Sequence, residues 1–257
     1  MSERNSRESR RRALDETRQG QDQRKRRLRL AAWGGAVVVA AGIGIGIGVA
    51  LSGSSSGATT GSGGFAPLSS LGTLAAAPAP GPLGSEKVPV PAVPVLAPVS
   101  AATTGQTIDG VECNTSEQLK FHIHTHLTVF VNGKQQQVPG GIGIPDAVSS
   151  PTQGGGSFIF SGKCLYWVHT HTGDGIIHVE SPKVETYTLG QFFDEWQQPL
   201  SSSQVGPAKG TVTAIVNGQV FQGDPREIPL ASHENVQLEV GTPLVAPQYI
   251  DWSATGL

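Results

Sequence analysis

The chain has 257 residues, of which 18 are Lys or Arg and 20 are Asp or Glu, for a formal net charge of −2. The charge is uneven: residues 1–30 hold eleven basic and five acidic side chains (net +6), which leaves seven basic and fifteen acidic ones (net −8) elsewhere. No aromatic residue is interleaved with the basic ones, and no glycine-rich phosphate motif follows a predicted strand. We therefore expect no nucleic-acid partner and no nucleotide site.

Residues 1–30 are predicted to be a basic cytoplasmic tail, followed by a single membrane-spanning helix at residues 31–51. These 21 residues carry no charge, and at about 1.5 Å per residue their helix is roughly 31 Å long, enough to cross a bilayer core. The basic flank predicts a cytoplasmic N-terminus and an extracytoplasmic remainder at the cell membrane. A signal peptide cleaved near Gly48-Val49-Ala50 is the alternative.

Glycines at spacings of four residues in the apolar segment, Gly42/Gly46 and Gly44/Gly48, are typical of closely packed membrane helices. They allow a weak homodimer through the membrane. The sequence identifies no protein partner.

Residues 52–105 are predicted to be a disordered linker. Their first part is rich in Ser, Gly, Ala and Thr, and prolines recur from Pro78 to Pro98, which favours extended polyproline II. Glu86 and Lys87 are the only charged residues in this segment. We expect a stalk that holds a domain away from the membrane.

Residues 106–248 are predicted to form one extracytoplasmic domain, followed by a tail at residues 249–257. The expected fold is mainly β (α+β), with antiparallel sheets, hairpins and one or two short helices. Asn132-Gly133 and Asn217-Gly218 predict two-residue hairpin turns with positive φ at both positions. Strands are expected at residues 127–131, 134–138, 157–160, 165–171, 176–180, 211–216, 219–222 and 236–240.

One helix has a clear signature. Thr188 and Gln191 form a capping box, and Pro199 follows as a stop signal. A second short helix is expected at residues 115–120. The apolar stripe of the first helix, at i, i+3, i+4 and i+7, is Leu189, Phe192, Phe193 and Trp196.

Cys113 and Cys164 are the only cysteines in the chain. Outside the cytoplasm two cysteines in one domain predict a structural disulfide. If the two cysteines are paired, neither sulfur can bind a metal. Met1 is the only methionine, so a methionine-rich copper site and the axial methionine of a blue-copper site are excluded as well.

Six of the seven histidines lie in two short segments that alternate with period two. As strands, these segments would project several imidazoles from one face, with neighbouring ring positions about 7 Å apart at the backbone. The outer two histidines of the first segment are about 13 Å apart, so either one is not a direct ligand or there are two sites. The predicted metal ligands are His122, His124, His126, His169, His171 and His178.

The histidines point to a divalent transition metal, with zinc or copper first and iron as a third option. Glu180 shares a strand face with His178 and can add an oxygen ligand. Asp174 and Glu180 are the first candidates for a catalytic base beside a bound ion. Imidazoles on the solvated face of a sheet, or a pH-responsive patch, are the alternatives.

The domain resembles an uncharacterised family of membrane-anchored actinobacterial envelope proteins. The resemblance spans residues 108–242 and rests on four motifs, and it implies a cell-envelope setting without implying a reaction. The motifs are His-x-His-x-His-Leu from His122, Tyr-Trp-Val-His-Thr-His from Tyr166, Thr-Leu-Gly-Gln-Phe-Phe from Thr188, and Gly-Asp-Pro-Arg from Gly223.

Three function classes stay open at this point. The first is an anchored extracytoplasmic metal-binding protein that acts as a carrier, sensor or store. The second is a metal-dependent enzyme, a hydrolase, lyase or oxygenase, at the same site. The third is an envelope interaction module that binds no metal.

Overall fold

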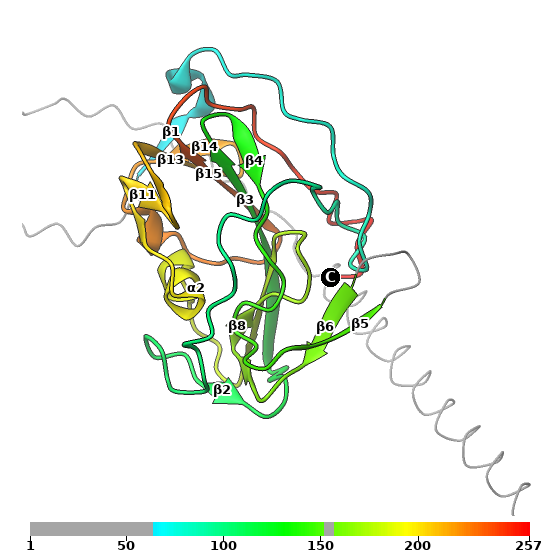
Figure 1. The fold of residues 1–257 in the computed structure, drawn as a ribbon. Helices are drawn as coiled ribbons and strands as arrows, with labels where there is room; N and C mark the ends of the chain where they lie inside the picture. The colour runs from blue at the N-terminus through cyan, green and yellow to red at the C-terminus, as the bar shows by residue number, and fades with distance from the viewer. Residues whose placement is uncertain (1–63, 152–156) are drawn as a thin grey trace, which may run out of the picture. The chain divides into compact units, whose positions relative to one another are not determined.

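The computed structural model describes residues 64–151 and 157–257, which form a mainly β domain with one short α-helix (Figure 1). The predicted cytoplasmic tail and membrane segment lie outside the described residues. Within those residues no helix is both long and apolar enough to cross a bilayer. The elements are β1 (Phe65–Pro67), η1 (Leu68–Leu71), β2 (Cys113–Asn114), β3 (Phe121–Val131), β4 (Lys134–Gln136), β5 (Val148–Pro151), β6 (Ser157–Ser161), β7 (Leu165–Tyr166), β8 (Val168–His169), β9 (Ile176–Ser181), α2 (Leu189–Trp196), β10 (Leu200–Ser201), β11 (Gln204–Val205), β12 (Ala208–Lys209), β13 (Val212–Val216), β14 (Gln219–Phe221), η2 (Pro225–Glu227) and β15 (Glu234–Val240).

The largest sheet of the described residues has eight strands in the order β1-β14-β13-β15-β3-β9-β8, with β4 also paired to β3. The pair β15–β3 is parallel, from Glu234 opposite Thr125 to Val240 opposite Val131, and the other pairs of this sheet are antiparallel. The prediction of antiparallel sheets alone was therefore wrong for this pair. A parallel neighbour needs a long crossover, here the chain that contains α2, and no local pattern in either strand encodes it.

The two Asn-Gly turns are confirmed. Asn132 and Gly133 have φ values of 49° and 73°, and Asn217 and Gly218 have 48° and 79°. The first turn joins β3 to β4 and the second joins β13 to β14. These turns set the register of both hairpins.

The predicted helix α2 is confirmed together with its capping box. The Gln191 amide donates to the Thr188 hydroxyl at 3.3 Å, and the Thr188 amide donates to the Gln191 side chain at 2.9 Å. The second predicted helix was wrong, because residues 115–120 form bends and a turn. They follow β2, where Asn114 is bonded to Trp167, and lead directly into the long strand β3.

Strands β3 and β9 have one apolar and one polar face, since side chains alternate along a strand. Leu127 and Val129 of β3 and Ile177 and Val179 of β9 belong to the buried core that also contains the α2 stripe. In Figure 1, α2 and the β5–β6 hairpin lie on opposite sides of these strands. The even-numbered positions form the other face, called the polar face below, which carries His122, His124, His126, His178 and Glu180 together with Thr128, Phe130 and Ile176.

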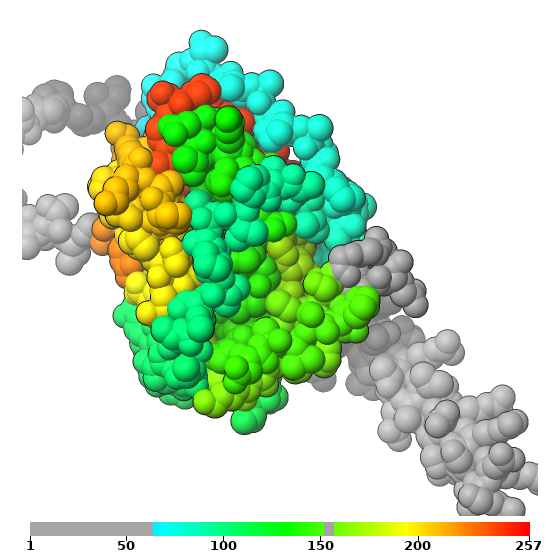
Figure 2. All heavy atoms as spheres, viewed as in Figure 1, coloured from blue at the N-terminus to red at the C-terminus, as the bar shows by residue number. Residues whose placement is uncertain are grey.

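Residues 64–105, expected to be part of a disordered linker, pack along the domain instead (Figure 2). Strand β1 pairs with β14, and Val95 forms a bridge with Gln137. Val88 is fully buried, and Leu96 is 7% exposed. Composition misled the prediction because the Val and Leu residues between the prolines supply apolar side chains that the domain buries.

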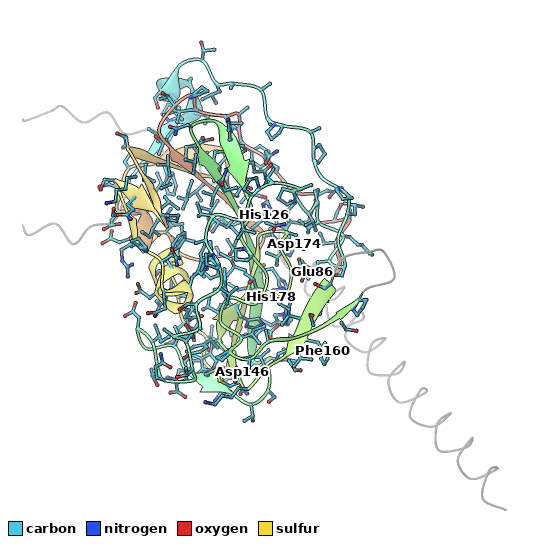
Figure 3. The ribbon with its side chains drawn as sticks, in the orientation of Figure 1. Glu86, His126, Asp146, Phe160, Asp174 and His178 are labelled. Carbon is cyan, nitrogen blue, oxygen red and sulfur yellow. A yellow bond between two sulfur atoms is a disulfide. The ribbon has the colours of Figure 1, made fainter. Side chains whose placement is uncertain are left out.

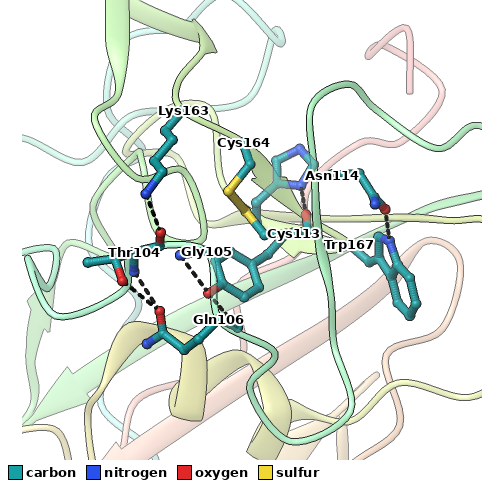
Figure 4. The surroundings of a disulfide bond; sticks show 10 residues. Thr104, Gly105, Gln106, Cys113, Asn114, Lys163, Cys164 and Trp167 are labelled. Carbon is teal, nitrogen blue, oxygen red and sulfur yellow. Dashed lines mark hydrogen bonds between the residues drawn. A yellow bond between two sulfur atoms is a disulfide. The ribbon is translucent and has the colours of Figure 1, made fainter.

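Cys113 and Cys164 form the predicted disulfide, which joins β2 to the residue before β7 (Figure 4). Around it, the Trp167 indole donates to the Asn114 side chain at 2.5 Å, and the Tyr166 hydroxyl donates to the Gln106 carbonyl at 2.5 Å. The disulfide therefore anchors the short strand that leads into the second histidine segment.

Candidate metal centre

Strand register brings the two histidine segments together on one face of the sheet. His124 of β3 lies opposite His178 of β9, and His169 of β8 lies opposite His178 from the other side. In the next row, His122 lies opposite Glu180. Three neighbouring strands thus contribute side chains to one region, as a shared metal centre requires.

His169 and His171 direct one nitrogen each at the other. Their Nε2 atoms are 3.1 Å apart, and both side chains are buried. His169 Nδ1 lies 2.8 Å from the Tyr166 carbonyl, and His171 Nδ1 lies 2.5 Å from the Ile159 carbonyl. A carbonyl only accepts hydrogen bonds, so both Nδ1 atoms carry protons and both Nε2 lone pairs face a common point.

The two facing lone pairs repel each other, and a proton on one Nε2 atom would relieve that repulsion. The surroundings of both rings disfavour this protonation. Burial and the charge of His178 together lower the pKa of His171 to about 4. Burial also lowers the pKa of His169 well below its usual value, with His171 and His178 adding to the effect. Both rings are neutral near pH 7, which is the form that binds a metal.

His178 sits between two carboxylates. Its Nε2 donates to Glu86 Oε1 at 2.7 Å, and its Nδ1 lies 3.5 Å from Glu180 Oε1. Burial alone would lower the pKa of His178, but the hydrogen bonds and charges of Glu180 and Glu86 outweigh it and raise the pKa to about 9. The site therefore already holds a positive charge as a proton, at a position where a cation can replace it.

Glu180 completes a group of four buried residues. One ligand atom each from His169, His171, His178 and Glu180 lies within 4.8 Å of the others, so the group can hold a metal ion. Glu180 is 3% exposed, and its Oε2 has no hydrogen-bond partner among the described residues. A buried carboxylate oxygen without a partner is costly, and a cation would satisfy it.

A second group of donors lies beside the first. One nitrogen each from His122, His124 and His178 lies within 4.8 Å of the others. His124 is buried, and its Nε2 has no partner in the part of the chain that the structure describes. Burial and the charge of His178 lower the pKa of His124 to about 3. This ring also stays neutral.

His126 and Asp174 lie outside both groups (Figure 3). His126 Nε2 donates to the Asp174 backbone carbonyl at 3.0 Å, and Asp174 Oδ1 accepts from the Ile176 amide at 3.1 Å. Burial, assisted by the charge of Glu86, raises the pKa of Asp174 to about 7. These two residues contact each other next to the two donor groups and belong to neither.

Besides Glu117, which lies 3.9 Å from His171 Nε2, Glu86 is a residue of the site that the sequence did not predict. It is 8% exposed and bonds to His178 across 92 residues of sequence (Figure 3). The available signal was its position, since Glu86 and Lys87 are the only charges in an otherwise neutral segment. A lone buried acid needs a partner, and His178 supplies it.

A cavity of about 380 Å³ opens onto the donors. It is lined by Glu86, His122, His124, His171, His178 and Glu180, among others. On its rim the Phe158 ring stacks on His171, with centroids 4.5 Å apart and planes 16° apart. The partly exposed His122 is the donor that this cavity leaves most open to solvent, whereas the other donors on its wall are buried.

Comparisons with protein-family models, curated proteins and solved structures found no match to the chain.

Proposed function

We propose that this protein binds a divalent transition metal through His169, His171, His178 and Glu180. The observation that carries the proposal is the 3.1 Å separation of the His169 and His171 Nε2 atoms. In both rings the Nδ1–H group donates a hydrogen bond to a backbone carbonyl, which leaves Nε2 as the acceptor. Two buried acceptor lone pairs at this distance repel each other, and a cation bound between them would remove the repulsion.

The distances match a metal ion in size. Zn–N bonds of about 2.0–2.1 Å in tetrahedral geometry place two ligand nitrogens about 3.3 Å apart. The carbonyl bonds of the two Nδ1 atoms are the outer contacts that ordinarily orient ligand histidines. The Glu86 bond to His178 Nε2 has the same role and leaves Nδ1 as the ligand atom.

The donor set favours zinc or copper(II), with iron as a third option. It contains imidazole nitrogens and a carboxylate oxygen, while both cysteine sulfurs are in the disulfide. Three histidines and one carboxylate are typical of zinc and copper sites, and two histidines and a carboxylate of iron oxygenases.

A metal-dependent enzyme is the second candidate function. The cavity of about 380 Å³ over the donors favours it, because a catalytic metal needs an open position and room for a substrate. A carrier, sensor or store would use the same four ligands with an exchangeable ion.

The disulfide supports an extracytoplasmic domain, since disulfides persist in oxidising compartments. We also propose that residues 31–51 span the membrane and anchor this domain, with the N-terminus in the cytoplasm. The cell-envelope setting implied by the family resemblance agrees with this topology.

Metal analysis of the purified full-length protein tests the proposal. After chelation and reloading with Zn²⁺, the wild-type protein should retain bound zinc through desalting, and His169→Ala/His171→Ala should lose it from this site. His233→Asn is the matched control, because His233 is exposed and Asn tolerates its φ of 60°. Wild-type protein without retained Zn²⁺, Cu²⁺ or Fe²⁺ would refute the proposal.

A further inference from the structure

Besides His126, which donates to the Asp174 carbonyl, two histidines of the polar face are not used by the four-residue centre. His122 and His124 occupy neighbouring same-face positions of β3, and their ring centroids are 4.6 Å apart. His122 lines the cavity with its side chain 38% exposed, whereas His124 is buried. The His124 Nε2 atom is without a hydrogen-bond partner among residues 64–151 and 157–257.

Glu180, itself part of the first centre, lies between His122 and the first-centre ligand His178. Its Oε1 lies 3.1 Å from His122 Nε2 and 3.5 Å from His178 Nδ1, and its Oε2 has no partner within the described residues. A carboxylate has two oxygens and can bind two ions at once. His178 cannot do this, because Glu86 occupies its Nε2.

We infer that the centre is binuclear, with a second divalent transition metal bound by His122, His124 and the Glu180 carboxylate, which bridges to the first ion. This inference rests on the proposed function for the first ion. The second ion would have two nitrogens and one oxygen from the protein, which leaves positions open toward the cavity.

The polar face provides two adjacent groups of donors, and acidic side chains surround them. Two-metal sites place their ions about 3.5–4 Å apart, a distance that one carboxylate spans. Three acidic side chains lie next to the histidines: Glu86, Glu180 and Glu117. The Glu117 carboxylate lies 3.9 Å from His171 Nε2. The partly exposed His122 places the second ion at the cavity mouth, so it should exchange faster than the first.

Zinc stoichiometry of the full-length protein tests the inference. Apo protein is saturated with Zn²⁺, desalted and analysed for zinc per chain by mass spectrometry. We expect two ions for wild type and for His233→Asn, and one for His122→Ala/His124→Ala. The single variant His122→Ala keeps the test valid if the double variant fails to fold, because it removes only a partly exposed side chain. His122→Ala should also retain one zinc ion per chain.

The outcomes separate this inference from the proposed function. Saturation of wild type at one ion, or two ions retained in both His122 variants, would overturn the second site and leave the first standing. Wild type with no bound zinc, copper or iron would overturn both. An anomalous-scattering map of zinc-loaded crystals should show two peaks about 3.5–4 Å apart on either side of Glu180; a single peak would overturn the inference.

Discussion

Glu86 accepts a hydrogen bond of 2.7 Å from His178 Nε2, although the two residues are 92 positions apart in the chain. The bond assigns the proton to Nε2 and leaves Nδ1 to face Glu180. It also connects the Pro-rich segment to strand β9, near one end of the large sheet. The segment is thus part of the site as well as a connection to it.

Replacing Glu86 with Gln should weaken metal binding about 10- to 100-fold, because outer partners of ligand histidines contribute that much to affinity. The amide keeps the shape of the side chain and loses the charge that favours a cation. Competition with a chromophoric chelator gives the dissociation constant. Glu112→Gln makes the same change at an exposed position and should leave the affinity unchanged. Equal affinities for the two variants would contradict the role of Glu86.

The Cys113–Cys164 disulfide should stabilise the domain by about 4 kcal/mol, since it closes a loop of 51 residues. It also positions β7, whose Tyr166 carbonyl orients His169. We expect Cys113→Ser/Cys164→Ser to lower the free energy of unfolding in urea by about that amount and to weaken zinc binding. Labelling of the intact wild-type protein should detect no free thiol before reduction. Two reactive thiols without reductant would show that the bond does not form.

The buried Glu195, which is not part of the candidate metal centre, should make the free energy of unfolding depend on pH. It lies in α2 with 1% exposure, and neither carboxylate oxygen has a partner within the described part of the chain. Burial, with a contribution from Asp194, raises its pKa well above the usual 4.5. The folded state therefore holds this proton when the unfolded state has released it.

Stability should fall as pH rises above about 4.5, by up to about 1.4 kcal/mol per pH unit, until the folded-state pKa is reached. Glu195→Gln carries no such proton, so its free energy of unfolding should lose this slope and exceed that of wild type at pH 7. Urea unfolding of chelator-treated protein between about pH 5 and pH 8 measures both. Parallel pH profiles for the two proteins would mean that Glu195 titrates normally.

Metal removal should lower the thermal stability of the folded protein. A ligand that binds the native state at 100 times its dissociation constant stabilises it by about 2.7 kcal/mol. We expect chelation to lower the Tm of wild type and of His233→Asn, and zinc to restore it. The His169→Ala/His171→Ala variant should show a much smaller change. Equal zinc-dependent shifts in all three proteins would place the stabilising ion elsewhere.

Local sequence patterns predicted the local parts of this fold. The Asn132-Gly133 turn, the Thr188 capping box and the shared polar face of His122 and His124 each depend on residues close together in the chain. These features were readable because a turn, a cap and strand alternation each have a short sequence signature.

Long-range pairing could not be read in the same way. The parallel contact of β15 with β3, and the alignment of His178 between His124 and His169, depend on which strands become neighbours. The Pro-rich composition around Glu86 predicted a disordered linker, although this segment packs on the domain. Sequence therefore predicted the types of ligand, and the tertiary contacts decided which of them meet.

An anomalous-difference map from crystals of the zinc-loaded protein tests most directly whether His169 and His171 bind one ion. We predict a peak about 2.0–2.1 Å from both the His169 and the His171 Nε2 atoms. Their Nδ1 atoms should keep their bonds to the Tyr166 and Ile159 carbonyls. A map without density between the two rings, or with zinc bound only at surface residues, would contradict the account.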